Sequence, residues 1–235
     1  MRAIIADLED REYSIRRLLD HVDEVSEVRG KIDVIVVLKS TVFISLYNNV
    51  EATVYAVIEK IHDLASSLEY DELIQPLKTK TLRYSFGKTA GAFMLDPQRV
   101  VLEEHALRSS NARFPTLSDY LRRQSLFSGN VDARKLNVIG ISYGMPKLLF
   151  SKFNAEHMLW VKNKRNKIAH GEQSMSDGGQ GLKTLDLRRA SDSVSIILRE
   201  FIAASDLYLK NRAYHKASLS HQASVRQVSS QDQLA

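Results

Sequence analysis

The sequence predicts an all-α protein, a helical bundle in which two long helices near the N-terminus pack against two later ones. Apolar residues recur with the 3.6-residue period of a helix through three long stretches, 3–28, 31–67 and 185–209. The period continues unbroken through the second stretch, so its β-branched start, 32–38, belongs to a helix and not to a strand. Glycine, proline and polar runs separate the stretches, as is typical of turns.

The first helix is expected over 3–28, and Gly30 is the residue that closes it. Its apolar side consists of Ile4, Leu8, Ile15, Leu18, Leu19 and Val22. The second helix is expected over 31–67. Residues 69–97 lose the helical period and contain two glycines and two prolines, so we expect an irregular insertion with short elements there.

Three shorter helices are expected over 98–109, 116–124 and 131–141. Pro115-Thr116 opens the second of them, and Gly129-Asn130 makes a turn before the third. A further helix is expected at 154–169 and the last one at 185–209. The polar, glycine-rich segment between these two is interpreted as a flexible loop, because its glycines follow no apolar strand.

The chain is expected to form one domain over 1–210, with the insertion at about 69–97. At 235 residues it is long enough to bury a substantial core. Residues 211–235 consist mainly of Ser, Gln, His and charged residues with few large apolar ones, so we expect a disordered polar tail.

The composition limits the class of protein. Cysteine is absent, which excludes disulfides and thiolate metal sites and is compatible with a reducing cytoplasm. The first twelve residues mix acids and bases and show no apolar signal region. The most apolar run, 32–38, contains Asp33 and is far too short to span a bilayer. We therefore expect a soluble protein of the cytoplasm.

The positive charge is concentrated in one part of the chain. Residues 76–170 contain 17 Lys and Arg against 6 Asp and Glu, although the net charge of the whole chain is only +5. Such a block is typical of a surface that binds a nucleic-acid backbone. A solubilising surface, or a patch that faces an acidic partner protein, would give the same count.

The segment 165–172 carries the candidate chemistry. It reads Arg-Asn-Lys-Ile-Ala-His-Gly-Glu, so that Asn166 directly follows Arg165, and four residues lie between Arg165 and His170. This spacing alone is weak, because Arg16 and His21 repeat it in a mixed-charge helix where an exposed surface is the better interpretation.

On an ideal helix Arg165 falls in the middle of an apolar side, a costly position for a guanidinium without a partner. That side consists of Met158, Val161, Ile168 and Ala169. His170 would point about 140° away from Arg165, whereas Asn166 and His170 share a side. Either the last turn is distorted before Gly171, a plausible C-terminal cap, or two copies of the chain build the site together.

These residues resemble the R-x4-6-H signature of the HEPN superfamily, and in particular the bacterial HEPN-like nucleases found with toxin-antitoxin and abortive-infection loci. Three blocks fit that branch in order and spacing, 46–53, 127–132 and 165–174. The resemblance extends from residue 30 to about 210. It implies a HEPN-type helical bundle and a metal-independent endoribonuclease.

Glu51 is the candidate partner of Arg165, because it interrupts an apolar and aromatic side of the second helix. The resemblance matches Glu51 to a polar position that lies near the Arg and His in family members. An ordinary buried ion pair that holds two helices together would explain the same pattern.

The expected catalytic residues are Arg165 and His170. A neutral His170 imidazole can take the proton of an RNA 2′-hydroxyl or return one to the leaving 5′-oxygen. The Arg165 guanidinium can bind the phosphate oxygens in a bidentate way as charge builds in the transition state. Asn166, Glu51 and Asn48 are expected to support the site. The neighbouring cations Lys162, Lys164 and Lys167 are expected to bind RNA.

Metal and cofactor chemistry have no motif in this sequence, so neither is expected. The seven histidines show no ligand spacing such as His-x3-His, and there is no phosphate-binding Gly-x4-Gly-Lys-Ser/Thr loop. Three further residues, His157, Trp160 and Tyr143, are most simply core or interface residues.

The sequence therefore predicts a HEPN-type endoribonuclease, a homodimer with RNA as its substrate, that acts as the toxic arm of a bacterial defence or toxin-antitoxin system. An antitoxin or defence protein would be its partner. The alternatives are a HEPN-like module that binds nucleic acid or protein without catalysis, and a structural partner within a larger defence complex.

Overall fold

A computed structural model describes residues 1–87, 97–127 and 129–218 of the chain. All regular elements within these residues are helices, apart from two isolated bridges between extended segments. The prediction of an all-α protein is therefore confirmed. The long helices lie close to their expected bounds, because the apolar period that predicts them continues over many turns.

The chain divides into two compact units. Unit 1 comprises Met1–Val57, Phe127–Asn137 and Leu148–Ala203. Unit 2 comprises Ile58–Leu126, Val138–Lys147 and Ala204–Ala235. Three helices contribute residues to both units, namely α2 (Ile32–Ala65), α7 (Ala133–Ser142) and α10 (Thr184–Lys210). The expected single domain over 1–210 stays a prediction.

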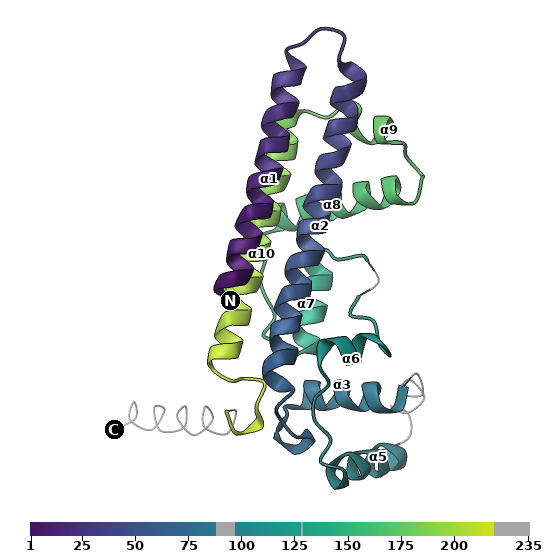
Figure 1. The fold of residues 1–235 in the computed structure, drawn as a ribbon, viewed down its shortest axis with the longest axis vertical. Coiled ribbons are helices and arrows are strands. Elements are labelled where there is room, and N and C mark those ends of the chain that lie inside the picture. The colour runs from purple at the N-terminus through teal and green to yellow at the C-terminus, as the bar shows by residue number, and fades with distance from the viewer. Residues whose placement is uncertain (88–96, 128, 219–235) are drawn as a thin grey trace, which may run out of the picture. The chain divides into compact units, whose positions relative to one another are not determined.

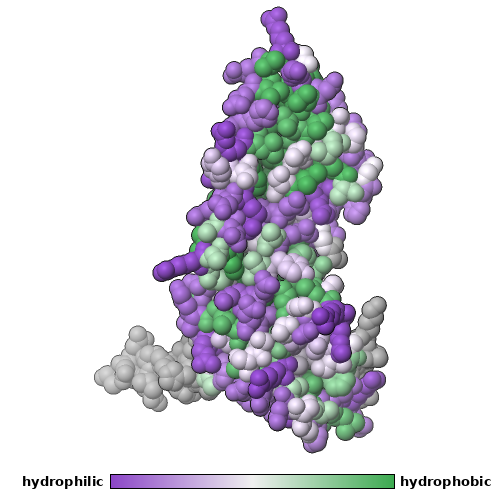
Figure 2. Space-filling view, viewed as in Figure 1, coloured by the Kyte–Doolittle hydropathy of each residue, from purple (hydrophilic) through white to green (hydrophobic). Residues whose placement is uncertain are grey.

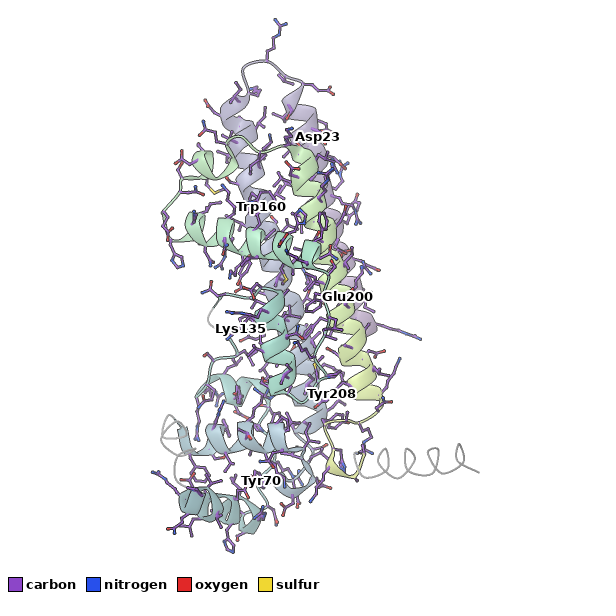
Figure 3. All side chains as sticks on the ribbon, turned by 180° about the vertical axis from the view of Figure 1, so that it is seen from behind. Asp23, Tyr70, Lys135, Trp160, Glu200 and Tyr208 are labelled. Atoms are coloured by element: carbon purple, nitrogen blue, oxygen red, sulfur yellow. The ribbon has the colours of Figure 1, made fainter. Side chains whose placement is uncertain are left out.

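In unit 1, α1 (Arg2–Ser26) and the first part of α2 form a helical hairpin, and α10 lies along α1 (Figure 1). Ion pairs join α1 to α10: Arg188 contacts Asp20 at 2.9 Å and Asp23 at 2.7 Å. Figure 3 shows Asp23 on α1 beside α10. The helix that carries the motif, α8 (Lys152–Ala169), runs across this layer (Figure 1).

The core of unit 1 forms where the apolar sides of these helices meet. The expected apolar side of α1 is buried except for Leu18, which is half-buried. From α2 the buried hydrophobic residues in unit 1 are Val42, Phe43, Leu46, Tyr47, Val50, Val54 and Val57. Trp160 of α8 packs edge-on against Phe43, with ring centroids 4.8 Å apart (Figure 3). These contacts fix α8 on α2, and with it the motif.

By length and composition alone, α2 is also apolar enough to span a membrane. In unit 1 this helix buries apolar residues such as Val42 and Phe43 and contacts α1 and α8. Arg11 of α1, for example, donates a hydrogen bond to the buried Asn49 amide oxygen at 2.9 Å.

The interpretation of the glycine-rich segment after α8 as a flexible loop is wrong. Residues Met175–Gly179 form a short helix, α9, and Gly178 and Gly179 are buried. A Cβ atom on Gly179 would lie 1.9 Å from the Val36 carbonyl oxygen of α2. The glycines are therefore positions of close contact between α9 and α2, a use of glycine that a loop composition does not reveal.

Unit 2 contains η1 (Tyr70–Glu72), α3 (Gln75–Phe86), α5 (Pro97–Ser109) and α6 (Leu117–Leu121). The insertion is more regular than expected, because α3 buries Leu77, Thr81 and Leu82 in spite of its weak apolar period. Thr116 caps α6 through a hydrogen bond from the Asp119 N–H, as the Pro115-Thr116 pair indicated. Gly91 lies outside the described residues.

The start of the expected tail is ordered, which corrects the prediction for 211–218. Tyr214 is buried, and its carbonyl oxygen accepts a hydrogen bond from the Ile74 N–H at 3.3 Å. Tyr214 is one aromatic residue in a mostly polar tail, so the average composition of the tail did not predict that this residue is buried. The rest of the tail, 219–235, lies outside the described residues.

Candidate active site

Arg165 lies on the inward side of α8. The helix begins at its N-cap Ser151, whose hydroxyl accepts a hydrogen bond from the Asn154 N–H at 3.2 Å. Met158 and Val161 are buried, and Arg165 shares their side, as the helical period predicted. Ala169, the last residue expected on this side, is exposed because it lies in the final turn.

Three groups hold the Arg165 guanidinium. Its Cζ atom lies 4.4 Å from the centre of the Tyr47 ring, a cation–π contact. Its Nη2 atom is 3.6 Å from the Glu51 carboxylate, and its Nη1 atom donates to the Asn166 amide oxygen at 3.2 Å. The Arg165 side chain is 23% exposed, so the guanidinium is fixed in place yet open to a ligand.

Tyr47 is itself anchored. Its hydroxyl oxygen accepts a hydrogen bond from the Val131 N–H at 2.8 Å. Burial raises the pKa of Tyr47 to about 12, and the Glu51 carboxylate adds to the shift. The phenol therefore stays neutral at working pH and offers Arg165 a fixed aromatic face.

The segment before α7 closes the other side of the site. Asn166 donates a hydrogen bond from its amide nitrogen to the Asn130 side-chain oxygen. Gly129 has φ +68°, and a Cβ atom there would lie 3.8 Å from the Glu51 carboxylate. The Gly129-Asn130 turn predicted from the sequence thus brings a second amide to the motif and passes directly beside Glu51.

His170 does not meet Arg165 within the chain. The His170 N–H donates to the Asn166 carbonyl at 2.9 Å, so the α-helical hydrogen bonding of α8 reaches its C-cap, His170. Of the two alternatives for the last turn, a distortion before Gly171 is limited to His170 itself, whose φ of −91° and ψ of 2° depart from the α-helix. Gly171, with φ +74°, then redirects the chain. The His170 side chain is exposed and makes no hydrogen bond or ion pair with any residue that the structure describes.

Of the three expected RNA-binding lysines, only Lys167 is exposed. Lys162 forms an ion pair with Asp132 at 2.7 Å, and Lys164 donates to the Gly178 carbonyl at 3.3 Å. Burial opposes the charge on Asp132, but the hydrogen bonds from Lys162 and the Lys135 N–H outweigh it, and the pKa of Asp132 lies below its ordinary value. Lys162 thus ties α8 to the start of α7.

A shallow depression of about 430 Å³ lies on the outer side of α8, next to the motif. It is lined by Trp160, Asn163, Lys164, Asn166, Lys167 and Glu172. Asn166 therefore lies between Arg165 on the inner side of the helix and an open surface on the outer side that carries Lys167 and Glu172. A phosphate chain that reaches Arg165 could continue along this surface.

Asn48 is exposed on α2 and makes no side-chain hydrogen bond with the described residues, whereas the buried Asn49 binds Arg11. Two residues without a role predicted from the sequence, Tyr47 and Asn130, hold Arg165 and Asn166. Tyr47 lies in the block 46–53 and Asn130 in the block 127–132. The resemblance thus pointed to these two segments, but it did not predict which side chains contact the motif.

No group of metal-ligating side chains is found in the described parts of the chain. The buried His62 of unit 2 contacts the Pro115 carbonyl and the Tyr143 hydroxyl, both at 2.8 Å, and burial lowers its pKa to about 4. His62 and Tyr143 are core residues. His157 is half-buried beside Ser193, at 3.3 Å, and Trp160 packs on Phe43, which also agrees with the predicted packing role.

Replacing Glu51 by glutamine tests its part in the site. The Glu51 and Arg165 side chains are 26% and 23% exposed, so the loss of their ion pair should cost less than about 1 kcal/mol of folding free energy. If the site cleaves RNA as the sequence predicts and Glu51 positions Arg165, the kcat should fall by about tenfold or more with only a small change in melting temperature. Asp20→Asn, which weakens the surface pair with Arg188, is the matched control. Wild-type kcat in Glu51→Gln would assign the pair to structure alone.

Comparison with known proteins shows the family of the chain. A family model described as HEPN_MAE_28990-like HEPN matches residues 1–214. Neither the curated proteins nor the solved structures gave a match to the chain. The matched residues extend from α1 through α10. The chain therefore belongs to the HEPN_MAE_28990-like family of the HEPN superfamily.

Proposed function

We propose that this protein is a metal-independent endoribonuclease whose catalytic residues are Arg165 and His170. The observation that supports this most is the way Arg165 is held. Tyr47, Glu51 and Asn166 surround its guanidinium at the surface of unit 1, although a residue kept only for packing would need no such set of polar partners. His170, an exposed imidazole at the end of the same helix that bonds to none of the described residues, supplies the acid or base.

The reaction would follow from these groups. The imidazole removes the proton of the RNA 2′-hydroxyl, whose oxygen attacks the adjacent phosphorus. Arg165 neutralises the charge that builds on the phosphate oxygens. The bond from phosphorus to the 5′-oxygen breaks, that oxygen takes up a proton, and the products are a 2′,3′-cyclic phosphate and a 5′-hydroxyl. DNA lacks the 2′-hydroxyl and would not be cut.

The proposal includes a homodimer. Arg165 lies on the inward side of α8 and His170 is exposed at its C-cap, which favours a site that two chains share. A two-fold pairing of α8 with its copy would bring Arg165 of one protomer to His170 of the other, and two-fold dimers are the commonest soluble oligomers. Exposed apolar side chains on α2, including Val34 and Val37, offer apolar surface that such a dimer could cover. Figure 2 shows an apolar area on one face of unit 1.

In the cell the enzyme would act in the cytoplasm as the toxic arm of a defence or toxin-antitoxin system, held in check by a protein partner. In the alternative, a binding module without catalysis, the Glu51 carboxylate that pairs with Arg165 forms a structural ion pair. Catalysis therefore requires the substrate phosphate to share Arg165 with Glu51. A cleavage assay separates the two functions.

Purified protein should cut single-stranded RNA in the presence of excess EDTA. The reason is that the nucleophile belongs to the substrate, and Arg165 does the work of charge neutralisation that a metal ion would otherwise do. Mass spectrometry of the fragments should detect 2′,3′-cyclic phosphate or its hydrolysis products, and the DNA of the same sequence should remain intact. Activity that disappears on chelation and returns with magnesium would contradict the proposed mechanism, and RNA binding without any cleavage would favour the binding module.

A further inference from the structure

An exposed pair of aromatic rings lies beside the Arg165 site. Tyr55 of α2 and Phe127, which precedes α7, contact each other edge to face, with ring centroids 5.9 Å apart and planes at 80°. The Tyr55 side chain is 39% exposed and Phe127 is half-buried. Among the described residues the Tyr55 hydroxyl has no hydrogen-bond partner. Both residues belong to unit 1, as the Arg165 site does.

Tyr55 and Phe127 are each close in sequence to a residue of the Arg165 site. Tyr55 follows Glu51 by four residues on α2, so their side chains are neighbours on the helix surface, with Cβ atoms about 6 Å apart. Phe127 lies in the segment that continues to Gly129, where a Cβ atom would be 3.8 Å from the Glu51 carboxylate, and to Asn130, which bonds Asn166. The aromatic pair is therefore next to the group that contacts Arg165.

We propose that Tyr55, supported by Phe127, stacks on a base of single-stranded RNA next to the phosphate that Arg165 binds. This inference rests on the proposed function, because it assumes that the ligand of Arg165 is an RNA phosphate. An aromatic face beside a cation is the arrangement that binds single strands with little sequence preference, the phosphate going to the cation and the base to the ring. The exposed amide of Asn48 lies on the same side of α2, seven residues before Tyr55, where it can meet the edge of a base.

The edge-to-face geometry supports this role. Phe127 meets Tyr55 at 80°, so it limits the rotation of the Tyr55 ring without covering both of its faces. A ring held in this way loses little conformational entropy when a base stacks on it. Duplex RNA would keep its bases stacked on one another, so the site should prefer single strands.

The test uses His170→Ala protein, in which the RNA stays intact, and short single-stranded RNAs that carry one 2-aminopurine at successive positions. Stacking on a tyrosine ring quenches the fluorescence of this base. At one position we expect quenching on binding, and Tyr55→Leu should abolish it and weaken binding by about tenfold or more. Tyr55→Phe keeps the ring, so it should show the same quenching and the same RNA affinity as the protein with Tyr55. Tyr13→Leu, at a tyrosine of α1 that is 60% exposed, is the matched control.

Cleavage by the otherwise unmodified protein gives a second measurement. Because the base stacks in both the ground state and the transition state, Tyr55→Leu should raise KM by a factor similar to the loss of binding and leave kcat nearly unchanged. If the ring had only a structural role, Tyr55→Leu would instead lower the melting temperature of the protein.

The inference is overturned if Tyr55→Leu binds RNA with unchanged affinity and quenching, if Tyr13→Leu has the same effect, or if no RNA binds at all. Loss of a copurifying protein partner in Tyr55→Leu with RNA binding intact would also overturn it, since the rings would then be a protein contact. A failure of the proposed function would give a different result. If RNA binding depends on Tyr55 but the protein never cleaves RNA, the stacking site is supported and the proposed nuclease activity is wrong.

Discussion

His170→Ala should abolish RNA cleavage and toxicity while the protein stays folded. His170 is exposed at the end of α8 and bonds to none of the described side chains, so removing its ring should change the free energy of unfolding by no more than about 0.5 kcal/mol. Loss of the acid or base in the reaction should lower kcat by at least about a hundredfold. Parallel measurements of melting temperature, RNA cleavage and growth on expression check both parts.

The chain offers a matched control in His21, which has the same spacing from an arginine as His170 has. His21 is exposed on α1 and contacts Glu24 at 3.3 Å, so His21→Ala should retain full activity. Arg165→Lys should be nearly inactive, because an ammonium offers no bidentate fork to the phosphate and stacks less well on Tyr47. His170→Ala protein that is folded and still cuts RNA would remove His170 from the mechanism.

Mixed dimers of Arg165→Ala and His170→Ala chains should regain activity that neither chain has alone. If each site takes Arg165 from one protomer and His170 from the other, a mixed dimer has one site with both groups and one with neither, and should show about half of the wild-type rate. The two chains are coexpressed with different affinity tags, and dimers that carry both tags are purified. Their rate is then measured against wild-type dimers at equal concentration.

Two outcomes would contradict the shared site. An active monomer would show that one chain brings Arg165 and His170 together after RNA binds. Mixed dimers without activity would show that each protomer needs both of its own groups. Either result would leave the assignment of the two catalytic residues intact, because that assignment is tested by the single substitutions.

The sequence by itself predicted the helices and the position of the motif. Apolar residues at helical spacing marked α1, α2 and α10, since long amphipathic helices bury one side wherever they pack. The same period placed Arg165 on the inward side of α8 and made Glu51 its candidate partner, and these two side chains lie 3.6 Å apart. An unpaired charge on an apolar side is costly, which is why the sequence alone indicated that a partner must exist.

The tertiary structure decided which groups meet. No period in the sequence shows that the Tyr47 ring lies under Arg165, that Asn130 bonds Asn166, or that Lys162 is bound to Asp132, because these contacts join segments far apart in the chain. The glycines of α9 were mistaken for a loop for the same reason: their function is the close approach of Gly179 to α2, and only the packed helices define that distance. Local pattern fixes the face that a residue occupies on its own helix, whereas its partner depends on how the helices pack.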